Sequence, residues 1–245
     1  MRIDLNCDVA EGVGNEAALM PWITSANIAC GYHAGDVALM TETVKLCKVS
    51  GVAIGAHPSF PDRENFGRTN MNLPADQLRA LVIEQVLLLR SIARAHGAEL
   101  HHVKPHGALY NIAAADPSLA AILAEAVAAV DDRLMFFGLS GSLMIRAAEQ
   151  LGLRTASEVF ADRTYQPDGT LTPRSKPDAL ITDREVSVQR ALAFATGKPV
   201  PAQDGTALLL KADTICLHGD GPDAIGFARA IHQRLSQEKI RIVHG

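Results

Sequence analysis

Side chains that could do acid–base chemistry stand where short apolar runs of this sequence end. Asp8 and Glu11 follow the run at residues 2–7, and His57 closes the run at residues 52–56. A carboxylate can act as a base or a metal ligand, and neutral imidazole suits either role near pH 7. The simpler alternative is structural, because an acidic pair after a strand is often a turn or a helix cap.

The densest group of such residues is the segment Lys104-Pro105-His106. A lysine at a strand end can polarise a carbonyl or bind phosphate. A structural ion pair with Asp8 or Glu158 is the alternative. If Lys104 is catalytic, we expect its replacement by alanine to remove turnover and to leave the fold intact.

Two further groups carry similar chemistry. His33 and Asp36 follow the run at residues 25–30, where Asp36 could instead be the N-cap of a helix reaching Ser50. His218 follows the run at residues 213–217, and the sequence His218-Gly-Asp-Gly could be only a turn. Individually these signals are weak, but together they place titratable groups at several strand ends.

Short extended runs alternate with helical ones, which predicts parallel strands covered by helices. The predicted strands are residues 2–7, 25–30, 52–56, 99–104, 134–138, 154–159 and 213–217, with 240–243 as a short eighth. Predicted helices span residues 74–96 and about 222–235, and another begins after Asp116-Pro117. Long irregular stretches at residues 60–73 and 161–182 follow strands, and such loops are functional lids or locally disordered.

The alternation of side chains along the strands distinguishes a barrel from an open sheet. In the first strand Asp4, Asn6 and Asp8 share one face, and the apolar residues share the other. An open parallel sheet needs both faces apolar, whereas a barrel can hold polar groups in its interior and places its active site at the carboxyl ends of its strands. The sequence therefore predicts one α/β domain over residues 1–245, a TIM-like (βα) barrel with seven strands.

Composition excludes several functional classes. The net charge of −4 provides no basic surface for nucleic acid. The most apolar stretch, residues 119–130, contains Glu125 and is too short to cross a bilayer, and Met1 to Asp4 reaches a carboxylate before any secretory apolar region could form. Four scattered cysteines predict reduced thiols in the cytoplasm, with Cys7 or Cys216 as a nucleophile being the alternative.

Several long motifs resemble the LamB/YcsF family. They are Asp4-Leu5-Asn6-Cys7-Asp8 with Glu11, residues 26–36 with Asn27 and His33, Gly55-Ala56-His57-Pro58-Ser59, Phe66-Gly67-Arg68, residues 103–111 with Lys104 and Tyr110, and residues 158–163 from Glu158 through Asp162 to Arg163. The resemblance runs nearly from end to end of the chain. Phe60 stands where most relatives have Tyr.

The resemblance implies a seven-stranded barrel of the glycoside hydrolase/deacetylase type. It also implies hydrolysis of 5-oxo-L-proline to L-glutamate, coupled to ATP hydrolysis in a complex with 5-oxoprolinase subunits B and C. ATP would then act through the complex, and a divalent metal remains open. Two other functions stay open: a metal-dependent amidase or sugar deacetylase that acts alone, and a non-catalytic subunit that binds a small acid.

Residue type and strand position then suggest individual roles. We expect Asp8 or His57 as general base, Lys104 near the developing oxyanion or phosphate, and His106 or His218 as the acid for the leaving nitrogen. The expected substrate-binding residues are Glu11, Asn27, His33, Arg68, Tyr110, Glu158, Asp162 and Arg163. The candidate metal ligands are Asp8, His33 and His57.

Overall fold

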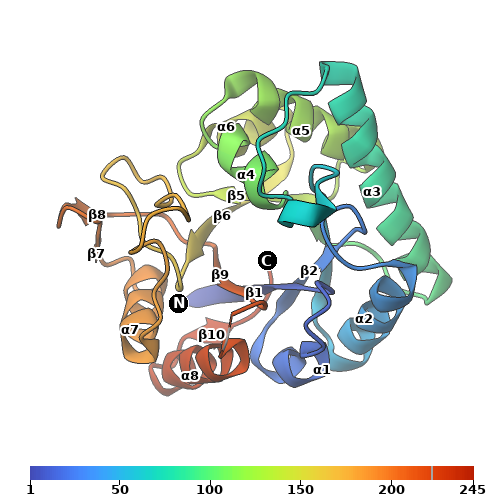
Figure 1. The fold of residues 1–245 in the computed structure, drawn as a ribbon. Helices are drawn as coiled ribbons and strands as arrows, with labels where there is room; N and C mark the ends of the chain where they lie inside the picture. Colours follow the sequence, from blue (N-terminus) through green and yellow to red (C-terminus); the bar gives the residue numbers. More distant parts are fainter. Residues whose placement is uncertain (222) are drawn as a thin grey trace.

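Seven parallel strands close into a barrel in the computed structural model, which describes residues 1–221 and 223–245 (Figure 1). The strands are β1 (Arg2–Val9), β2 (Ser25–Ala29), β3 (Ala53–His57), β4 (His102–Val103), β5 (Met135–Leu139), β6 (Arg154–Phe160) and β9 (Thr214–His218). Each pairs with the next in this order, and β9 pairs with β1 to complete the ring. The predicted seven-stranded barrel is confirmed.

Strand β4 is shorter than the predicted run of residues 99–104. The parallel hydrogen bonding nevertheless continues on both sides of it, because His101 donates its N–H to Ile54 and Lys104 donates its N–H to Ala56. Pro105 then ends the strand, since it has no N–H to donate. Lys104 is thereby fixed by the backbone of β3.

Three short strands lie outside the ring. The predicted eighth run forms β10 (Arg241–Ile242), which pairs in parallel with the first residues of β1. The sequence did not predict the antiparallel hairpin of β7 (Val200–Pro201) and β8 (Ala207–Leu208). Each strand of that hairpin has only two residues, which is too short for a side-chain alternation to be visible.

Helices surround the barrel (Figure 1). They are α1 (Glu16–Leu19), α2 (Val37–Ser50), α3 (Ala75–Ala95), α4 (Gly107–Ala113), α5 (Pro117–Val130), α6 (Leu143–Gln150), α7 (Arg184–Ala195) and α8 (Ala224–Gln237), with short 3-10 helices η1 (Met20–Trp22) and η2 (Arg63–Asn65). Asp36 caps α2 by accepting a hydrogen bond from the Leu39 N–H. The predicted start of the last helix at Pro222 lies outside the described residues.

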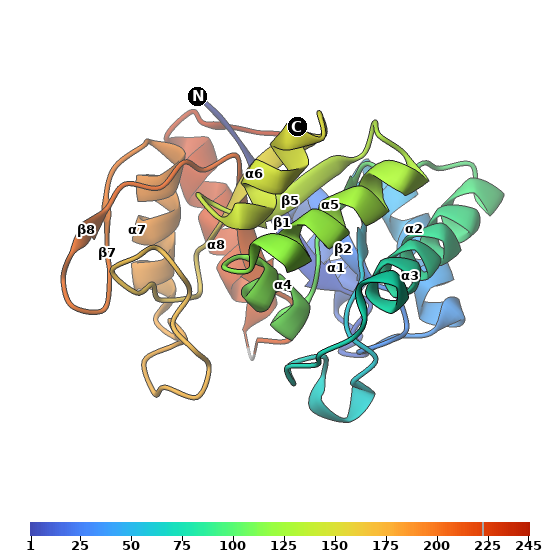
Figure 2. The same cartoon turned by 90° about the horizontal axis from the view of Figure 1, so that it is seen from above.

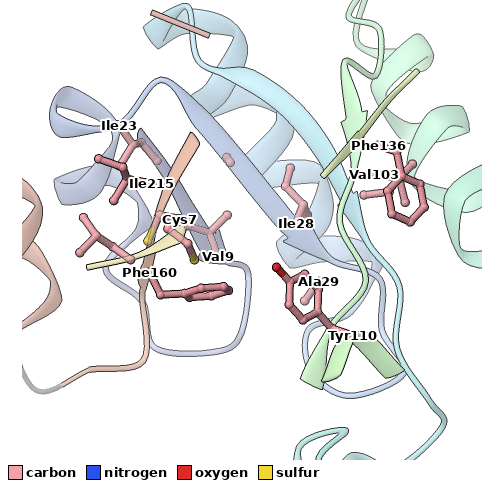
Figure 3. Packing of buried hydrophobic residues seen from close by; sticks show 14 of the residues in the cluster. Cys7, Val9, Ile23, Ile28, Ala29, Val103, Tyr110, Phe136, Phe160 and Ile215 are labelled. Atoms are coloured by element: carbon pink, nitrogen blue, oxygen red, sulfur yellow. The ribbon is translucent and has the colours of Figure 1, made fainter. Parts of the chain in front are cut away.

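The two faces of the barrel strands differ as the alternation predicts. Apolar side chains such as Cys7, Ile28 and Ile215 belong to the buried cluster that includes the helices (Figure 3). Inside the ring, Asp4 Oδ1 accepts a hydrogen bond from Ser25 and Asp4 Oδ2 accepts one from Thr214. The interior therefore contains a hydrogen-bonded polar network rather than only packed aliphatic side chains.

A glycine is required where β3 faces β4. A Cβ atom at Gly55 would lie 2.0 Å from Nε2 of His102. His102 in turn contacts Oδ1 of Asn27 at 2.7 Å and stacks on Phe137, with ring centroids 4.1 Å apart. The histidine thus fills the space that the glycine leaves, and it holds the amide of Asn27 beneath the mouth of the barrel.

Both long irregular stretches lie on one side of the barrel, and both chain ends lie on the opposite side (Figure 2). The loop at residues 161–182 has its own order, with isolated bridges from Arg163 to Leu180 and from Tyr165 to Leu171. The guanidinium of Arg163 donates hydrogen bonds to the carbonyls of Thr172 and Ala179. The sequence left open whether this stretch is a functional lid or locally disordered. Its internal hydrogen bonds support an ordered loop, and several of its residues line the cavity at the mouth of the barrel.

No single helix within residues 1–221 and 223–245 is long and apolar enough to span a membrane. Helices α4 and α5 are long and apolar enough only when taken together, and the chain bends by 117° at the break between them.

Candidate active site at the mouth of the barrel

Asp8 and Lys104 form the centre of the candidate site. Lys104 Nζ lies 2.8 Å from Asp8 Oδ1 and 2.9 Å from Glu158 Oε1, and all three side chains are buried. Asn27 also donates to Asp8 Oδ1 at 2.7 Å. Asp8 belongs to β1 and Glu158 to β6, the two strands that flank β9 in the ring. Because Lys104 directly follows β4, its ammonium group links three parts of the barrel at the mouth. Both carboxylates named as possible ion-pair partners of Lys104, Asp8 and Glu158, therefore contact its ammonium group.

Proximity of opposite charges sets the ionisation of this pair. Burial alone would raise the pKa of Asp8, but His57 and Lys104 outweigh it and hold that pKa well below its ordinary value. Burial would lower the pKa of Lys104, but Asp8, Cys216 and Glu158 raise it well above its ordinary value. Near neutral pH the site thus holds an aspartate anion and an ammonium cation.

His33, His57 and His106 form a group of three histidines that contacts Asp8 through His57. His57 Nε2 lies 3.4 Å from Asp8 Oδ2 and 2.9 Å from Nδ1 of His106. His33 stacks on His106, with ring centroids 3.7 Å apart and planes 5° apart, and its Nε2 lies 3.2 Å from Oε1 of Glu11. Ligand atoms of Glu11, His33, His57 and His106 all lie within 4.8 Å of one another, so this group could hold a metal ion.

The local backbone places this histidine group. Ala10 and Phe66 both have left-handed conformations, with φ of 60° and 57°, and they directly precede Glu11 and Gly67. A Cβ atom at Gly67 would approach His33 and His106 to 2.9 Å, so only glycine allows the chain to cover both rings. Strain of this kind is retained at functional sites more often than elsewhere.

Burial determines the charge of the outer members of the group. Burial, followed by the neighbouring His57, lowers the pKa of His33 well below its ordinary value. Burial, followed by His33 and His57, does the same for the pKa of His106. Burial and the nearby Asp8 raise the pKa of Glu11 well above its ordinary value. Two neutral imidazoles therefore face a carboxyl group that resists ionisation.

His218 stands on the opposite side of Asp8, as its partner in the pairing of β1 with β9. Its Nδ1 lies 2.8 Å from Oδ2 of Asp162, which also accepts the backbone N–H of His218 at 3.0 Å. Burial would raise the pKa of Asp162, but the adjacent His218 outweighs it and lowers that pKa. The carboxylate orients the His218 ring through Nδ1, and Nε2 makes no hydrogen bond within the part of the chain that the structure describes.

A cavity of about 470 Å³ opens over these groups. Of the predicted site residues, those that line it are Asp8, His57, Arg68, Lys104, His106, Tyr110, Arg163 and His218. The predicted residues that do not line it are Glu11, Asn27, His33, Glu158 and Asp162. Each of these five contacts a residue that lines the cavity. Asn27 contacts Asp8, Glu158 contacts Lys104 and Tyr110, and Asp162 contacts His218. Glu11 and His33 adjoin His106.

The structure adds residues that the sequence did not single out. Arg174 lines the cavity from the loop at residues 161–182, and Asn70 does so from the other long loop. The only sequence signal for either was the length of its loop, which predicts a functional segment but no particular residue. His106 was predicted as a catalytic residue, and its place among the candidate metal ligands depends on a turn whose geometry the sequence does not reveal.

The surroundings of the cysteines do not favour a nucleophilic role. All four are free and buried. Burial raises the pKa of the Cys7 and Cys216 thiols well above their ordinary value, so little thiolate forms near neutral pH. Cys216 instead lies 2.9 Å from Lys104 Nζ and completes the surroundings of that ammonium group.

Comparisons with known proteins match this arrangement along the whole chain. The model of the LamB/YcsF family matches residues 3–244. A crystal structure described as a lactam utilization protein from Thermus thermophilus is 40% identical, with a TM-score of 0.94, and the similarity covers 100% of both chains.

More distant structures share the fold alone. A putative cellobiose-phosphate cleavage protein from Enterococcus faecalis is 12% identical with a TM-score of 0.56, over 99% of this chain and 97% of that one. A family 4 carbohydrate esterase from Streptomyces lividans, in complex with acetate, is 12% identical with a TM-score of 0.51, over 98% of this chain and 91% of that one. The predicted glycoside hydrolase/deacetylase type of barrel is confirmed.

Proposed function

The chain belongs to the LamB/YcsF family, and we propose that it opens the lactam ring of 5-oxo-L-proline to give L-glutamate. It would do so as the ring-opening component of an ATP-dependent 5-oxoprolinase, together with subunits B and C. One observation carries the proposal: the chain is similar along its full length to a lactam utilization protein. The cytoplasm, where ATP is available, is the proposed location.

The chemistry of the substrate explains why ATP would be required. A five-membered lactam is an almost unstrained amide, and its resonance resists attack by water. Transfer of the γ-phosphoryl group to the lactam oxygen breaks that resonance and forms ADP. Addition of one water and cleavage of the C–N bond, followed by hydrolysis of the acyl phosphate by a second water, yields glutamate and phosphate.

Asp8 is the proposed proton acceptor for the attacking water. Its Oδ1 is occupied by Asn27 and Lys104, whereas among the described residues Oδ2 has only the longer 3.4 Å contact with His57. The low pKa of Asp8 makes it a weak base, so the water must be activated by a second group as well. Lys104, held against Asp8 and Glu158, would supply positive charge to the phosphorylated lactam oxygen and to the oxyanion that forms when water adds.

His218 is the proposed acid for the leaving nitrogen. Its Nδ1 is held by Asp162, and its Nε2 makes no hydrogen bond within residues 1–221 and 223–245, so a His218 protonated on both nitrogens would give the proton from Nε2. His106 suits this role less well, because its Nε2 contacts the carbonyl of Phe66 and its Nδ1 contacts His57. Of the two alternatives, the hydrogen bonding favours His218.

The substrate is an anion, and arginines line the cavity entrance. Arg68 forms an ion pair with Asp220, and Arg163 is bonded to carbonyls of its own loop. Within residues 1–221 and 223–245, Arg174 makes no side-chain hydrogen bond or ion pair, and it lines the same cavity. Arg174 is therefore the proposed partner of the substrate carboxylate, with Arg68 beside it.

The deciding experiment measures glutamate release from 5-oxoproline by three preparations: this protein alone, subunits B and C alone, and the mixture. Each is assayed with ATP and without it. We expect release only from the mixture with ATP, together with stoichiometric ADP. No release from the complete mixture with ATP would contradict the proposal, and binding of 5-oxoproline without turnover would then favour a non-catalytic role.

A second candidate is a metal-dependent amidase or deacetylase that acts without partners. The group of Glu11, His33, His57 and His106 favours it, because imidazole and carboxylate are the ligands of catalytic zinc sites. In the same experiment, glutamate release by this protein alone, independent of ATP and abolished by a chelator, would support this candidate over the first.

A further inference from the structure

Hydrogen bonding within the histidine group turns one ring nitrogen of His57 and one of His106 toward each other. His57 Nδ1 lies 2.7 Å from the carbonyl of Lys104, and His106 Nε2 lies 2.8 Å from the carbonyl of Phe66. A carbonyl oxygen can only accept, so each of these nitrogens must carry its proton. The remaining nitrogens, His57 Nε2 and His106 Nδ1, lie only 2.9 Å apart, so either a shared proton or another cation must stand between them.

The same reasoning applies to His33. Its Nδ1 lies 2.9 Å from Oγ of Ser59, whose own proton is directed at the carbonyl of Phe60 at 3.0 Å. His33 Nδ1 therefore donates, and Nε2 is a lone pair 3.2 Å from Oε1 of Glu11, whose carboxyl group would give up its proton on binding a metal ion. Gln85 on α3 fixes Ser59 by bonding both its N–H and its carbonyl. The orientation of the rings is thus built into the fold.

A cation is the group that such a set of acceptors would bind. We infer that a divalent transition-metal ion binds among Glu11, His33, His57 and His106. At metal–ligand bonds of about 2.0–2.1 Å, neighbouring ligand atoms of a tetrahedral site lie about 3.3 Å apart. Three of the six separations here are 2.9, 3.2 and 3.7 Å, close to that value, and all six are within 4.8 Å. Donation of each second ring nitrogen to a carbonyl or hydroxyl is the usual support of metal-binding histidines.

The ligand types select the class of ion. Three imidazoles and one carboxylate suit zinc, cobalt, nickel or iron, whereas magnesium and calcium prefer oxygen ligands throughout. The rings of His57 and His106 stand at 84° to each other, and their facing nitrogens are 2.9 Å apart, so a small separation of the two rings would let both nitrogens bind one ion. His33 is parallel to His106, so its ring must tilt to join them. Glu11, His57 and His106 therefore form the minimal set.

The inference that a metal ion binds here does not depend on the proposed function, whereas a role of that ion in ring opening rests on it. A bound ion of this class supplies Lewis acidity, which lowers the pKa of a coordinated water. Asp8 Oδ2 lies 3.4 Å from His57 Nε2, next to this group. The weak base Asp8 would then accept a proton from a water that is already acidified.

The test uses the complete protein, dialysed against a chelator and titrated with Co²⁺ in the absence of substrate and ATP. We expect one ion per chain by elemental analysis, visible d–d absorption bands, displacement by Zn²⁺ and no displacement by equimolar Mg²⁺. Glu11→Gln and His106→Gln should each weaken Co²⁺ binding at least about 100-fold, because even the loss of an outer partner costs 10- to 100-fold.

The matched control is His218→Gln, which alters a histidine of the same cavity outside the group and should leave Co²⁺ affinity unchanged. Circular dichroism establishes that each variant is folded. Should the Glu11 and His106 variants fail to fold, the titration of the unaltered protein decides. Absence of stoichiometric Co²⁺ binding there, or equal loss in the control, would overturn the inference and leave a shared proton between His57 and His106. Because no turnover is measured, this result is independent of whether the ring-opening activity exists.

Discussion

At the scale of single residues, Lys104 is a buried cation between two carboxylates. Its replacement by alanine leaves Asp8 and Glu158 buried and unpaired, and breaking a buried pair in this way costs about 3–5 kcal/mol. We therefore expect Lys104→Ala to lower the free energy of unfolding by that amount as well as to remove turnover. The sequence alone predicted an intact fold, and the buried ion pair adds the prediction that the folded protein is less stable, which urea unfolding measures.

A double variant isolates the charge effect. Glu158→Gln keeps the shape of the side chain and removes the negative charge of the Lys104–Glu158 pair. The loss of unfolding free energy in the double variant Lys104→Met with Glu158→Gln should therefore be smaller than the sum of the losses in the two single variants. Tyr110 can still donate to the amide oxygen that replaces the carboxylate oxygen. Additive losses would mean that the ion pair contributes nothing beyond packing.

Asp162 gives the acid sensitivity of the site a definite sign. Its pKa is lowered in the folded protein because His218 outweighs burial, so its contribution is fully present above the ordinary value of 3.8 and is lost as pH falls through the folded pKa. We expect Asp162→Asn to cost about 1.5–3 kcal/mol at neutral pH. Urea unfolding between about pH 7 and about pH 3 should show the two proteins converging at the acid end. A gap that widens with acidification would show that the pKa is raised instead.

At the scale of elements, the loop at residues 161–182 is expected to determine substrate affinity. Arg174 lines the cavity from this loop, whereas the nearby Lys176, which is also exposed, does not. A charge-assisted hydrogen bond to the substrate carboxylate is worth about 1.5–3 kcal/mol, so Arg174→Ala should raise KM about 10- to 100-fold with a smaller change in kcat. Lys176→Ala is the control, and steady-state kinetics of the complete complex is the measurement. A fall in kcat at unchanged KM would contradict the assignment.

The elements also show how far the sequence alone could lead. Alternation along β1 predicted that Asp4, Asn6 and Asp8 face the interior, because a strand has a strict two-residue period. It could not predict which titratable groups meet, because that depends on strand register and on turns such as Phe66-Gly67. Hence His33 and His57, named as candidate metal ligands, lie in one group with Glu11 and His106, while Asp8 adjoins it and pairs with Lys104.

At the scale of the whole molecule, the barrel separates chemistry from stability. The cavity and both long loops lie at one end, and both chain termini lie at the other (Figure 2). In barrels of this kind the end opposite the active site contributes to stability rather than to catalysis. Strand β10 belongs to that end, because it extends the sheet only beside the first residues of β1.

Removal of residues 241–245 tests this separation. The deletion loses the hydrogen bonds from Arg241 N–H to the Met1 carbonyl and from Val243 N–H to the Ile3 carbonyl. Each contributes about 0.5–1.5 kcal/mol, so we expect the free energy of unfolding to fall by about 1–3 kcal/mol and Tm to fall with it. Because Asp8 lies at the far end of β1, Co²⁺ affinity and turnover in the complex should match those of the intact chain at temperatures where both are folded. A loss of Co²⁺ binding without any loss of stability would instead mean that the closing strand positions the mouth of the barrel.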